Sequence, residues 1–475
     1  MKFALVLPHL KVGGAQKQAV LLFRELSARG HTVRFVLTDP RSRLAKDRFQ
    51  MLTQLEIDPS IVLTRKSRVN LMAWYSLLYD LLNRRKPSRD QEGPRFLRPP
   101  HPFGKLLLTS KKVAQRIFIR PIASLGAKNL MMRFQDRLRK SRKVLLTAIA
   151  WPLPFLVHRN IRLRLRGLEA GQANSISALV KRPTILLRAD HLAKVLTPWK
   201  PDAIVSFLTQ SNILSILAMP ARYPVAISER NDVVRQPVRP EIGVLRKTTY
   251  PGAALITANS PHVVTDLDGM FPDSRVQWFP NQFPLAVSPR DDHQKTLGML
   301  CRIEAQKNVR LVVEAFLGSS ARLRGWKLII FGNGPERDSI AKLLEHVGAE
   351  AKVELPGVTN NPTQALEQID VFISASDYEG SSNSIHEAVA SGSVPLVAST
   401  VGEYREIVPQ RLFRATSFSL SKESLRKRLD AVCAEEHTLA QMRQDTRTYF
   451  ERYWARGREV REKLLTEFEQ LAQKP

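Results

Sequence analysis

Short, almost continuously apolar runs alternate with amphipathic segments along this 475-residue chain, and this alternation constrains the fold more than any other feature. Near the N-terminus, "KFALVLP" (2–8) is followed by the Gly13-Gly14 loop, an amphipathic stretch that stops at Gly30, and "TVRFVLT" (32–38). That order predicts a buried strand, a helix and a second strand, the unit from which parallel sheets covered by helices are built. Four further apolar runs continue the rhythm between residues 201 and 281.

A second series of the same kind begins at Lys295. Its apolar runs (295–303, 326–334, 369–376 and 394–399) alternate with helical patterns at 308–318, 335–348 and 384–391. The length also exceeds what a single hydrophobic core usually supports. We therefore predict an α/β fold with two Rossmann-like, doubly wound domains, at 1–290 and 291–450, followed by a C-terminal helix at 451–475.

The first predicted domain contains a strongly basic insertion at about 62–190. The formal net charge of the chain is +29. Residues 65–166 hold 25 Lys or Arg residues but only four acidic ones, so most of the excess positive charge is concentrated there. This distribution indicates one dedicated basic module rather than a basic surface over the whole fold.

The insertion also carries the apolar stretch "VLLTAIAWPLPFLV" (144–157), which has basic residues on both sides. The stretch is too short to span a bilayer and contains two prolines, but apolar side chains framed by cations suit an anionic membrane surface. We predict a peripheral protein on the inner face of the cytoplasmic membrane. A solvated or partner-binding face is the alternative, and nucleic-acid binding is disfavoured because aromatic residues are sparse among the basic ones.

The cysteine content indicates a reducing compartment. Only Cys301 and Cys433 occur, without the spacing of a metal site or a disulfide framework. The acidic pair in "DLD" (266–268) falls within a helical pattern and is no convincing metal site either. We therefore expect no metal and no cofactor.

Two acidic residues flank a small-residue loop in "DYEGSSNSIHEAVASGSVPLVAS" (377–399). Glu379 follows a predicted strand, and Glu387 lies one turn into the next helix. In parallel α/β folds the carboxyl ends of strands hold ligands, so both carboxylates are candidates for accepting hydrogen bonds from hydroxyl groups. Asn383 is predicted to cap the helix, whose first amides would then face a phosphate. The loop between them would let backbone approach a ligand closely and consists of Gly380, Ser381 and Ser382.

Three other loops follow strands in the same way. Arg302 and Lys307 lie beyond the strand at 295–303, where cations stabilise the charge that develops on a departing diphosphate. Gly334, in "GNGPER", occupies a strand-to-helix turn that could admit a base or a ribose. Gly13 and Gly14 precede a helix and give the geometry that binds anions. Each signal is weak alone, and His386, beside Glu387, is expected to be packed or exposed on its helix rather than catalytic.

Together, "GGAQ", "RIEAQKN", "FGNGPER", the pair Glu379 and Glu387, and "VGEYREIV" resemble the retaining glycosyltransferases of family 4, in that family's order. The resemblance covers roughly residues 1–40 and 200–410. It implies a GT-B fold, in which two Rossmann-like domains face a cleft that holds a nucleotide sugar, and it implies no metal. By this resemblance, the domain at 1–290 binds the acceptor and the domain at 291–450 binds the nucleotide sugar. By resemblance, Glu379 contacts the donor sugar, Glu387 its ribose, and Arg302 and Lys307 the diphosphate, with Gly13 and Gly14 closing over it.

The chain departs from this pattern in its first domain. Many family members place a His at a strand end where this chain has "VSFLTQSN", so Gln210 or Asn212 would have to supply that contact. In place of a common His-Asp pair the chain has "ISERND", including Asp232, which resembles members that extend bacterial surface glycans on lipid carriers.

The function predicted from the sequence is transfer of a hexose or N-acetylhexosamine, with retention, from a UDP-linked or other nucleotide diphosphate sugar. The acceptor would be a lipid-linked glycan of surface polysaccharide or lipopolysaccharide biosynthesis, and the catalytic residues would be Arg302, Lys307 and Glu379. Two alternatives remain open. One is a sugar-nucleotide epimerase or hydrolase of GT-B type, which would need no acceptor, and the other is a catalytically degenerate homologue that binds membranes or a partner transferase.

Overall fold

The computed structural model describes residues 1–10, 13–39, 60–63, 182–219, 223–283, 294–348, 350 and 352–473. They all belong to one compact unit formed by residues 1–67 and 163–475. The basic segment at 65–166, with the apolar stretch predicted to meet a membrane, lies outside the described residues. Among the described residues, no helix has both the length and the apolar character needed to cross a bilayer.

The first sheet has seven parallel strands in the order β3-β2-β1-β4-β5-β6-β7. β1 is central, and its Leu5 pairs with Phe35 on one side and Val205 on the other. The strands are β1 (Lys2–Leu7), β2 (Thr32–Leu37), β3 (Ser60–Leu63), β4 (Ala203–Phe207), β5 (Val225–Glu229), β6 (Leu255–Ala258) and β7 (Val276–Trp278). Its helices are α1 (Gly14–Ala28), α12 (Pro183–Trp199), α13 (Thr209–Ala218), α14 (Pro240–Thr249) and α15 (Pro261–Met270), with the short η4 (Tyr250–Gly252).

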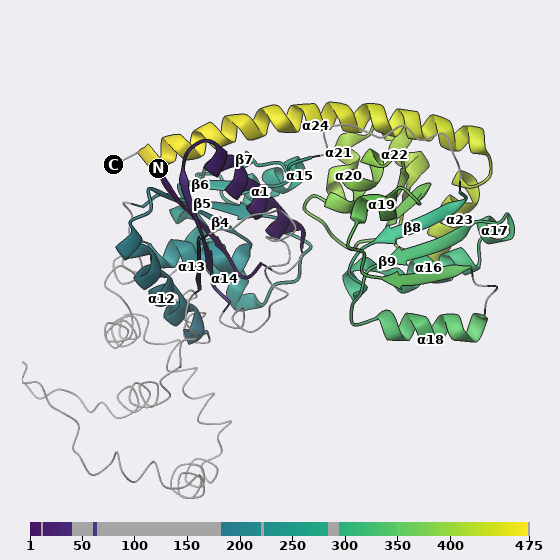
Figure 1. The fold of residues 1–475 in the computed structure, drawn as a ribbon, viewed down its shortest axis with the longest axis horizontal. Coiled ribbons are helices and arrows are strands. Elements are labelled where there is room, and N and C mark those ends of the chain that lie inside the picture. Colours follow the sequence, from purple (N-terminus) through teal and green to yellow (C-terminus); the bar gives the residue numbers. More distant parts are fainter. Residues whose placement is uncertain are drawn as a thin grey trace, which may run out of the picture. The chain divides into compact units, whose positions relative to one another are not determined.

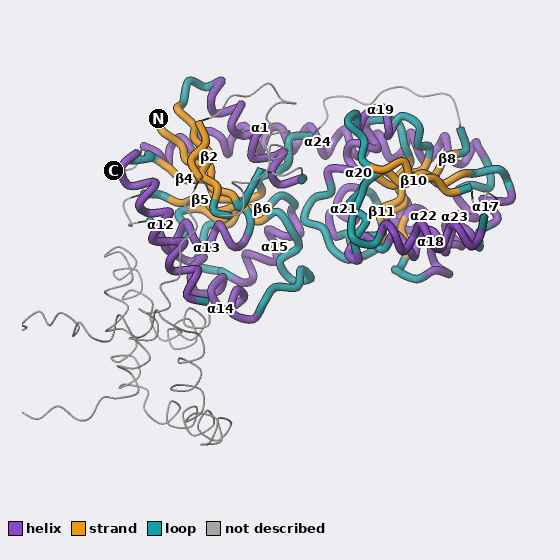
Figure 2. Tube along the Cα trace, turned by 60° about the horizontal axis from the view of Figure 1, so that its bottom comes forward, coloured by secondary structure: helices purple, strands orange, loops and turns teal. Residues whose placement is uncertain are grey.

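The second sheet has six parallel strands in the order β10-β9-β8-β11-β12-β13. They are β8 (Thr296–Leu300), β9 (Lys327–Phe331), β10 (Val353–Gly357), β11 (Val371–Ser374), β12 (Val394–Ala398) and β13 (Ser417–Phe418). The helices are α16 (Val309–Leu317), α17 (Ser320–Leu323), α18 (Arg337–Val347), α19 (Pro362–Leu366), α20 (Asn383–Ala390), α21 (Gly402–Ile407), α22 (Gln410–Thr416) and α23 (Lys422–Val432), with η5 (Ala305–Lys307). Helices surround the strands of each sheet (Figures 1 and 2), which confirms the predicted α/β architecture.

The last helix, α24 (Glu436–Gln473), contacts the cores of both domains (Figure 1). Its Leu439 belongs to the core of the second sheet, and Trp454 packs with residues of α20 and α21. Farther along, Leu464 and Phe468 belong to the core of the first sheet. The helix therefore begins 15 residues before the C-terminal helix predicted at 451–475, and it joins the two cores through one continuous element.

A buried ion pair fixes the end of α24 that lies on the first domain. Arg461 donates from Nε and Nη2 to the two carboxylate oxygens of Glu25 on α1, at 2.7 and 2.5 Å. Its Nη1 also donates to the carbonyl oxygen of Pro280 at 2.7 Å. This two-pronged geometry is the strongest arrangement of a guanidinium and a carboxylate.

We expect the Phe468→Ala substitution to destabilise the protein by about 3 to 5 kcal/mol, the usual cost of removing a buried aromatic ring. Phe468 is 1% exposed and packs edge-on against Phe279, with ring centroids 5.4 Å apart. Urea denaturation followed by circular dichroism measures the effect. The matched control is Glu459→Ala on the exposed side of the same helix, which should leave the unfolding midpoint unchanged. Equal midpoints for the two variants would show that α24 does not stabilise the first domain.

Candidate active site

The predicted site residues of the second domain follow three neighbouring strands. β9, β8 and β11 are adjacent in the sheet and parallel, so their carboxyl ends meet at one edge. Gly334 follows β9, Arg302 and Lys307 follow β8, and Glu379 follows β11. The topology therefore brings these loops together, as the sequence predicts.

Lys307 and Glu379 form an ion pair at this edge. Their side chains are 19% and 12% exposed. The Ser376 hydroxyl donates to Glu379 Oε1 at 2.8 Å, and Lys307 Nζ lies 3.4 Å from the same hydroxyl oxygen. Burial by itself lowers the pKa of Lys307, but the neighbouring Glu379 carboxylate more than offsets this effect, so the pKa is raised. Lys307 is therefore a positively charged group with a fixed position at the carboxyl edge of the sheet.

Asn308 holds the η5 turn against the end of β11. Its side-chain amide donates to the carbonyl oxygen of Ala375 at 2.9 Å and to Asp377 Oδ1 at 2.7 Å. Gln306 adds a bond from its side-chain amide to the carbonyl oxygen of Tyr378 at 2.8 Å. Because both neighbours of Lys307 are tied to this segment, the cation and Glu379 keep their positions relative to each other.

Arg302 lies in the same loop as Lys307, but its side chain contacts neither Lys307 nor Glu379 in the described structure. It pairs with Glu304 at 2.8 Å and is 71% exposed. The structure thus brings Lys307 and Glu379 together and leaves Arg302 at the surface beside them. Most of its guanidinium therefore remains accessible while one nitrogen pairs with Glu304.

Gly334 is required by a close approach of two backbones. A Cβ atom at this position would lie 2.2 Å from the carbonyl oxygen of Ile303, which is closer than any side chain tolerates. The amide of Ile303 also donates to the carbonyl oxygen of Asn333 at 3.0 Å. The glycine therefore allows the loop after β9 to pack directly on the loop that carries Arg302 and Lys307.

The loop Gly380–Ser382 leads into α20, but the predicted cap was wrong. Ser382, not Asn383, is the N-cap residue, and its side chain makes no capping hydrogen bond. Its amide donates to the buried Glu403 carboxylate at 3.3 Å. Asn383 is instead the first residue of the helix, and its side chain is used for contacts with the first domain.

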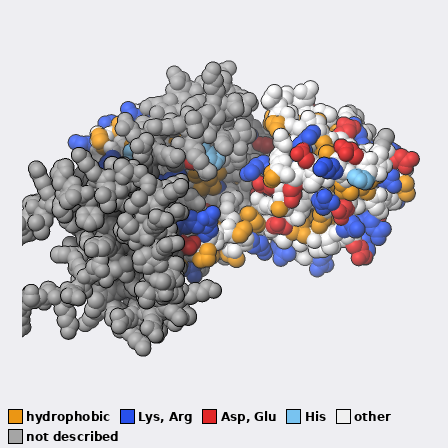
Figure 3. Space-filling view, turned by 90° about the horizontal axis from the view of Figure 1, so that it is seen from below, with side chains coloured by type: hydrophobic (Ala, Val, Ile, Leu, Met, Phe, Trp, Pro, Cys, Tyr) orange, Lys and Arg blue, Asp and Glu red, His pale blue; other side chains and the backbone are white. Residues whose placement is uncertain are grey.

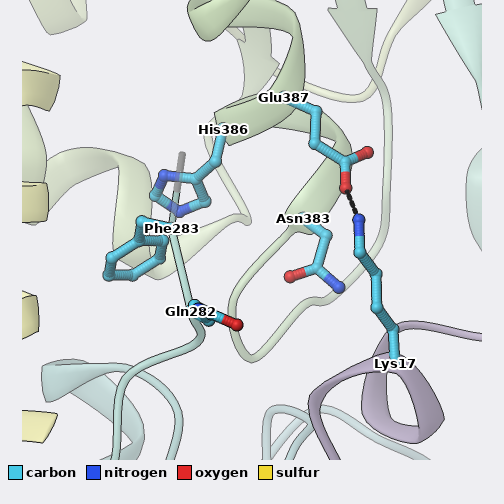
Figure 4. Close-up of a pocket in the computed structure, with 6 residues that line it drawn as sticks. All are labelled: Lys17, Gln282, Phe283, Asn383, His386 and Glu387. Carbon is cyan, nitrogen blue, oxygen red and sulfur yellow. Dashed lines mark hydrogen bonds and ion pairs between the residues drawn. The ribbon is translucent and has the colours of Figure 1, made fainter. Parts of the chain in front are cut away.

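Side chains from both domains line a cavity of about 210 Å³ beside α20 (Figure 4). Lys17, on α1, extends toward Glu387, on α20, and its ammonium group donates to Glu387 Oε1 at 2.6 Å. Both side chains remain partly exposed, at 46% and 26%. The remaining lining residues are Gln282, Phe283, Asn383 and His386. The cavity thus offers a carboxylate, an ammonium group, two amides and an aromatic ring.

Asn281 connects the first domain to the loop before α20. Its side-chain amide donates to Ser381 Oγ at 3.2 Å and to Asn383 Oδ1 at 2.6 Å. Gln18, on α1, also donates to Asn383 Oδ1, at 3.4 Å. Gly14 lies against the same residue, since a Cβ there would be 2.9 Å from Asn383 Nδ2. The predicted glycine loop and the predicted loop of the second domain are therefore in contact.

A buried layer beneath the cavity supports it. His386 is 1% exposed, and its Nδ1 accepts a hydrogen bond from the Trp454 indole at 2.8 Å. A ring nitrogen that accepts carries no proton, so His386 is neutral with its proton on Nε2, 3.2 Å from Glu403 Oε2. Tyr453 donates to the other Glu403 oxygen at 3.0 Å. His386 is thus packed, which is one of the two outcomes that the sequence leaves open.

The structure excludes one of the two replacements proposed for the missing His of the first domain. Asn212 is fully buried, and its amide donates to the carbonyl oxygen of Ser228 and to the Tyr250 hydroxyl, both at 3.2 Å. Gln210 is exposed at the start of α13. Asp232 is buried and accepts from the amides of Val234 and Arg235, so it shapes its own turn.

The sequence interpretation missed Lys17, Asn281, Ser376 and Glu403. Lys17 lies one turn beyond the glycine pair in "GGAQKQ", where a helix-face argument could have found it. The other three carry no local pattern that marks them. Within the described ranges, no cluster of three or more His, Cys, Asp or Glu residues could hold a metal ion.

Residues 284–449 match the family described as Glycosyl transferases group 1. The chain is 33% identical over 98 residues to a poly(ribitol-phosphate) alpha-N-acetylglucosaminyltransferase of Staphylococcus aureus (strain COL), which covers 21% of this chain and 20% of that protein. It is 36% identical over 90 residues, 19% of this chain and 24% of the other, to an N-acetylgalactosamine-N,N'-diacetylbacillosaminyl-diphospho-undecaprenol 4-alpha-N-acetylgalactosaminyltransferase of Campylobacter jejuni. These alignments thus span about a fifth to a quarter of the relatives' length.

The likeness to solved structures extends over the whole chain. A crystal structure of an S. aureus TarM mutant in complex with Fondaparinux, alpha-GlcNAc-glycerol and UDP superposes with a TM-score of 0.61 at 11% identity, over 98% of this chain and 99% of the other. At that identity the likeness establishes the fold alone. The chain therefore has the predicted GT-B fold, and the match to the glycosyltransferase group 1 family covers residues 284–449 of its second half.

We expect the Lys307→Met variant to lose about 1 to 3 kcal/mol of stability, because it leaves the Glu379 carboxylate largely buried without its cation. The Lys307→Met/Glu379→Gln double variant should recover part of that loss. Urea denaturation of the two single variants and the double variant gives the coupling between the side chains. Strictly additive losses would show that the ion pair contributes nothing to the site.

Proposed function

We propose that this protein is a retaining glycosyltransferase of family 4 that moves a hexose or N-acetylhexosamine from a UDP-linked sugar to a lipid-linked glycan. The observation that carries the proposal is the position of Glu379 and Glu387 along a single strand-loop-helix segment, with Lys307 from the loop after β8 paired to Glu379. The group 1 domain at 284–449 contains that whole segment and supports the assignment.

The two carboxylates take different parts of the donor in this proposal. Glu379 is held by Lys307 and Ser376, so its second oxygen is oriented to accept hydrogen bonds from the hydroxyls of the transferred sugar. Glu387 lies one turn into α20, beside an amide-lined cavity, and accepts from the ribose diol. In the structure the Lys17 ammonium group donates to the Glu387 carboxylate, and this ion pair must break when a ribose binds.

The diphosphate of the donor lies between these carboxylates, where positive charge is available. Lys307 is a fixed ammonium at the strand end, and the N-terminus of α20 adds the positive end of a helix dipole. Arg302 joins them through the accessible part of its guanidinium. These groups stabilise the charge on the departing diphosphate as it develops, which is the main electrostatic requirement of the reaction.

The proposed chemical step keeps the anomeric configuration by same-face attack. The bond between the anomeric carbon and the phosphate oxygen breaks, and its electron pair leaves with the nucleoside diphosphate. The acceptor oxygen forms the new bond on the same face of the sugar and gives its proton to the departing phosphate oxygen. The step uses no enzyme nucleophile.

The acceptor and the location of the enzyme belong to the same proposal. The names of the two relatives describe transfer to a poly(ribitol-phosphate) and to a diphospho-undecaprenol-linked sugar, and both acceptors carry phosphate. An acceptor of that kind, with the basic and apolar sequence at 65–166, supports action at the inner face of the cytoplasmic membrane. The resemblance to family 4 supports a reaction that uses no metal ion.

We expect UDP to bind the wild-type protein and the Glu387→Ala variant to bind it at least about ten times more weakly, since the variant loses the acceptor for the ribose diol. Isothermal titration calorimetry measures the affinity, and a thermal-shift screen of nucleotide sugars then identifies the donor. The control is Glu345→Ala, which removes an exposed carboxylate on α18 in the same domain.

Unaltered UDP affinity in the Glu387→Ala variant would contradict the role of this residue. Consumption of a UDP-sugar without any acceptor would favour an epimerase or a hydrolase. UDP binding without turnover on any lipid-linked acceptor would favour a degenerate homologue.

A further inference from the structure

The ion pair between Lys17 and Glu387 lies where two helices from different domains meet at their first turns. Lys17 is in the first turn of α1, and Glu387 lies one turn into α20. The starts of the two helices are in contact, because a Cβ atom on Gly14 would lie 2.9 Å from Asn383 Nδ2. The positive ends of two helix dipoles therefore lie side by side next to this ion pair.

Both members of the pair remain accessible. The Lys17 ammonium group donates to Glu387 Oε1 at 2.6 Å, and the two side chains are 46% and 26% exposed. An ion pair with this exposure contributes little to stability, since water competes for both groups. The pair therefore opens at small cost when a ligand offers either group a better partner.

A ribose that binds Glu387 competes with Lys17. The diol of the ribose donates two hydroxyl groups, which together use both carboxylate oxygens, and Oε1 already accepts from Lys17. A nucleoside has no anionic group, so it displaces the ammonium group without offering it a new acceptor. A nucleoside diphosphate brings phosphate oxygens, which accept short charge-assisted hydrogen bonds from ammonium groups. The same ion pair thus opposes binding of the nucleoside more than binding of the diphosphate.

Lys17 is placed so that its side chain reaches a diphosphate at the start of α20. Side chains on a helix lean toward its N-terminus, so the stem of Lys17 extends toward the contact between Gly14 and Asn383. Lys17 and Asn383 line the same cavity (Figure 4). The neighbouring Gln18 donates to Asn383 Oδ1 at 3.4 Å and accepts from the amide of Gln282 at 2.6 Å, which holds this turn of α1 in place. Rotation of one side chain therefore carries the ammonium group from the carboxylate to the phosphates.

Lys307 does not make the same distinction, because its ion pair need not open. Lys307 and the Ser376 hydroxyl both donate to Oε1 of Glu379, whose other oxygen stays available to a ligand. On the face of the second domain seen in Figure 3, positive and negative side chains are interspersed, so the described part of that face has no broad field of one sign. Selection for an anion consequently depends on Lys17, the cation that the ligand itself releases.

We propose that Lys17 selects nucleoside diphosphates over nucleosides by changing its partner. Its ammonium group leaves Glu387 Oε1 when the ribose diol binds that carboxylate, and it then donates to the diphosphate. Loss of the nucleoside diphosphate restores the ion pair. The inference rests on the proposed function, because it takes the ligand to be the UDP portion of the donor, and it adds a specificity-determining residue from the first domain.

Calorimetric titration of the full chain with UDP and, at millimolar concentration, with uridine tests the change of partner. We expect the Lys17→Met variant to bind UDP about fivefold more weakly than the wild type, because a charge-assisted bond to phosphate is lost. The same variant should bind uridine about twofold more tightly, because no ion pair has to break. The ratio of the two affinities should therefore fall about tenfold.

Two further variants serve as controls. Lys17→Arg keeps the positive charge and should keep the preference for UDP within about threefold of the wild type. Arg24→Met removes an exposed cation farther along α1 and should leave both affinities within about twofold. Lys17 is partly exposed, so its variants are expected to fold, and their melting temperatures verify this.

Unchanged UDP affinity in the Lys17→Met variant would overturn the inference. Equal weakening of UDP and uridine would also overturn it, since that result indicates a purely structural role for Lys17. UDP binding that depends on Glu387 but not on Lys17 would reject the change of partner and leave the proposed function standing. Absence of UDP binding to the wild-type protein would reject the proposed function and this inference together.

Discussion

The parallel direction of every strand in both sheets is the constraint from which the rest of this structure follows. A parallel pair can be joined only by a connection that crosses back over the sheet, and here helices make most of these connections. All loops after strands consequently gather at one edge of each sheet. In the second domain this places Lys307, Glu379 and the start of α20 side by side, although the loops after β8 and β11 are about 70 residues apart in sequence. In the first domain it places the N-termini of three helices around one basic cavity.

The candidate site also depends on polar groups that never face a ligand. Arg230 is almost fully buried, and burial, with Arg461 nearby, lowers its pKa to about 9. It donates to the carbonyl oxygen of Phe279 at 3.0 Å and to Asn281 Oδ1 at 2.6 Å. Because the Asn281 oxygen is occupied by this donor, its amide nitrogen is directed to Ser381 and Asn383. A buried cation in one domain thus orients the loop that precedes α20 in the other.

The two cavities differ in the way they could bind a charged ligand. Beside α20, carboxylates and an ammonium group alternate with amides, which suits the hydroxyls and phosphates of a nucleotide sugar. Among α12, α13 and α14, three arginines line the cavity together with mostly buried aliphatic side chains. α24 continues the chain of the second domain and packs on the cores of both domains, so it holds them together through buried side chains.

The sequence by itself determined the local elements, because strand and helix periodicity and glycine stops act over a few residues. The runs at 2–8, 295–303 and 369–376 are strands, Gly30 and Gly348 end helices with positive φ, and the residues after strands could be identified as candidates. Three strands were missed: β3 is a four-residue edge strand, β10 is an edge strand that contains Pro356, and β13 has only two residues. Only the tertiary structure decided which side chains meet. Lys17 bonds Glu387 across 370 positions, and Asn383 contacts Asn281 of the first domain while Ser382 takes the N-cap position, because packing between distant segments selects these contacts. Arg302 pairs with its neighbour Glu304 at the surface, which strand and helix periodicity does not specify.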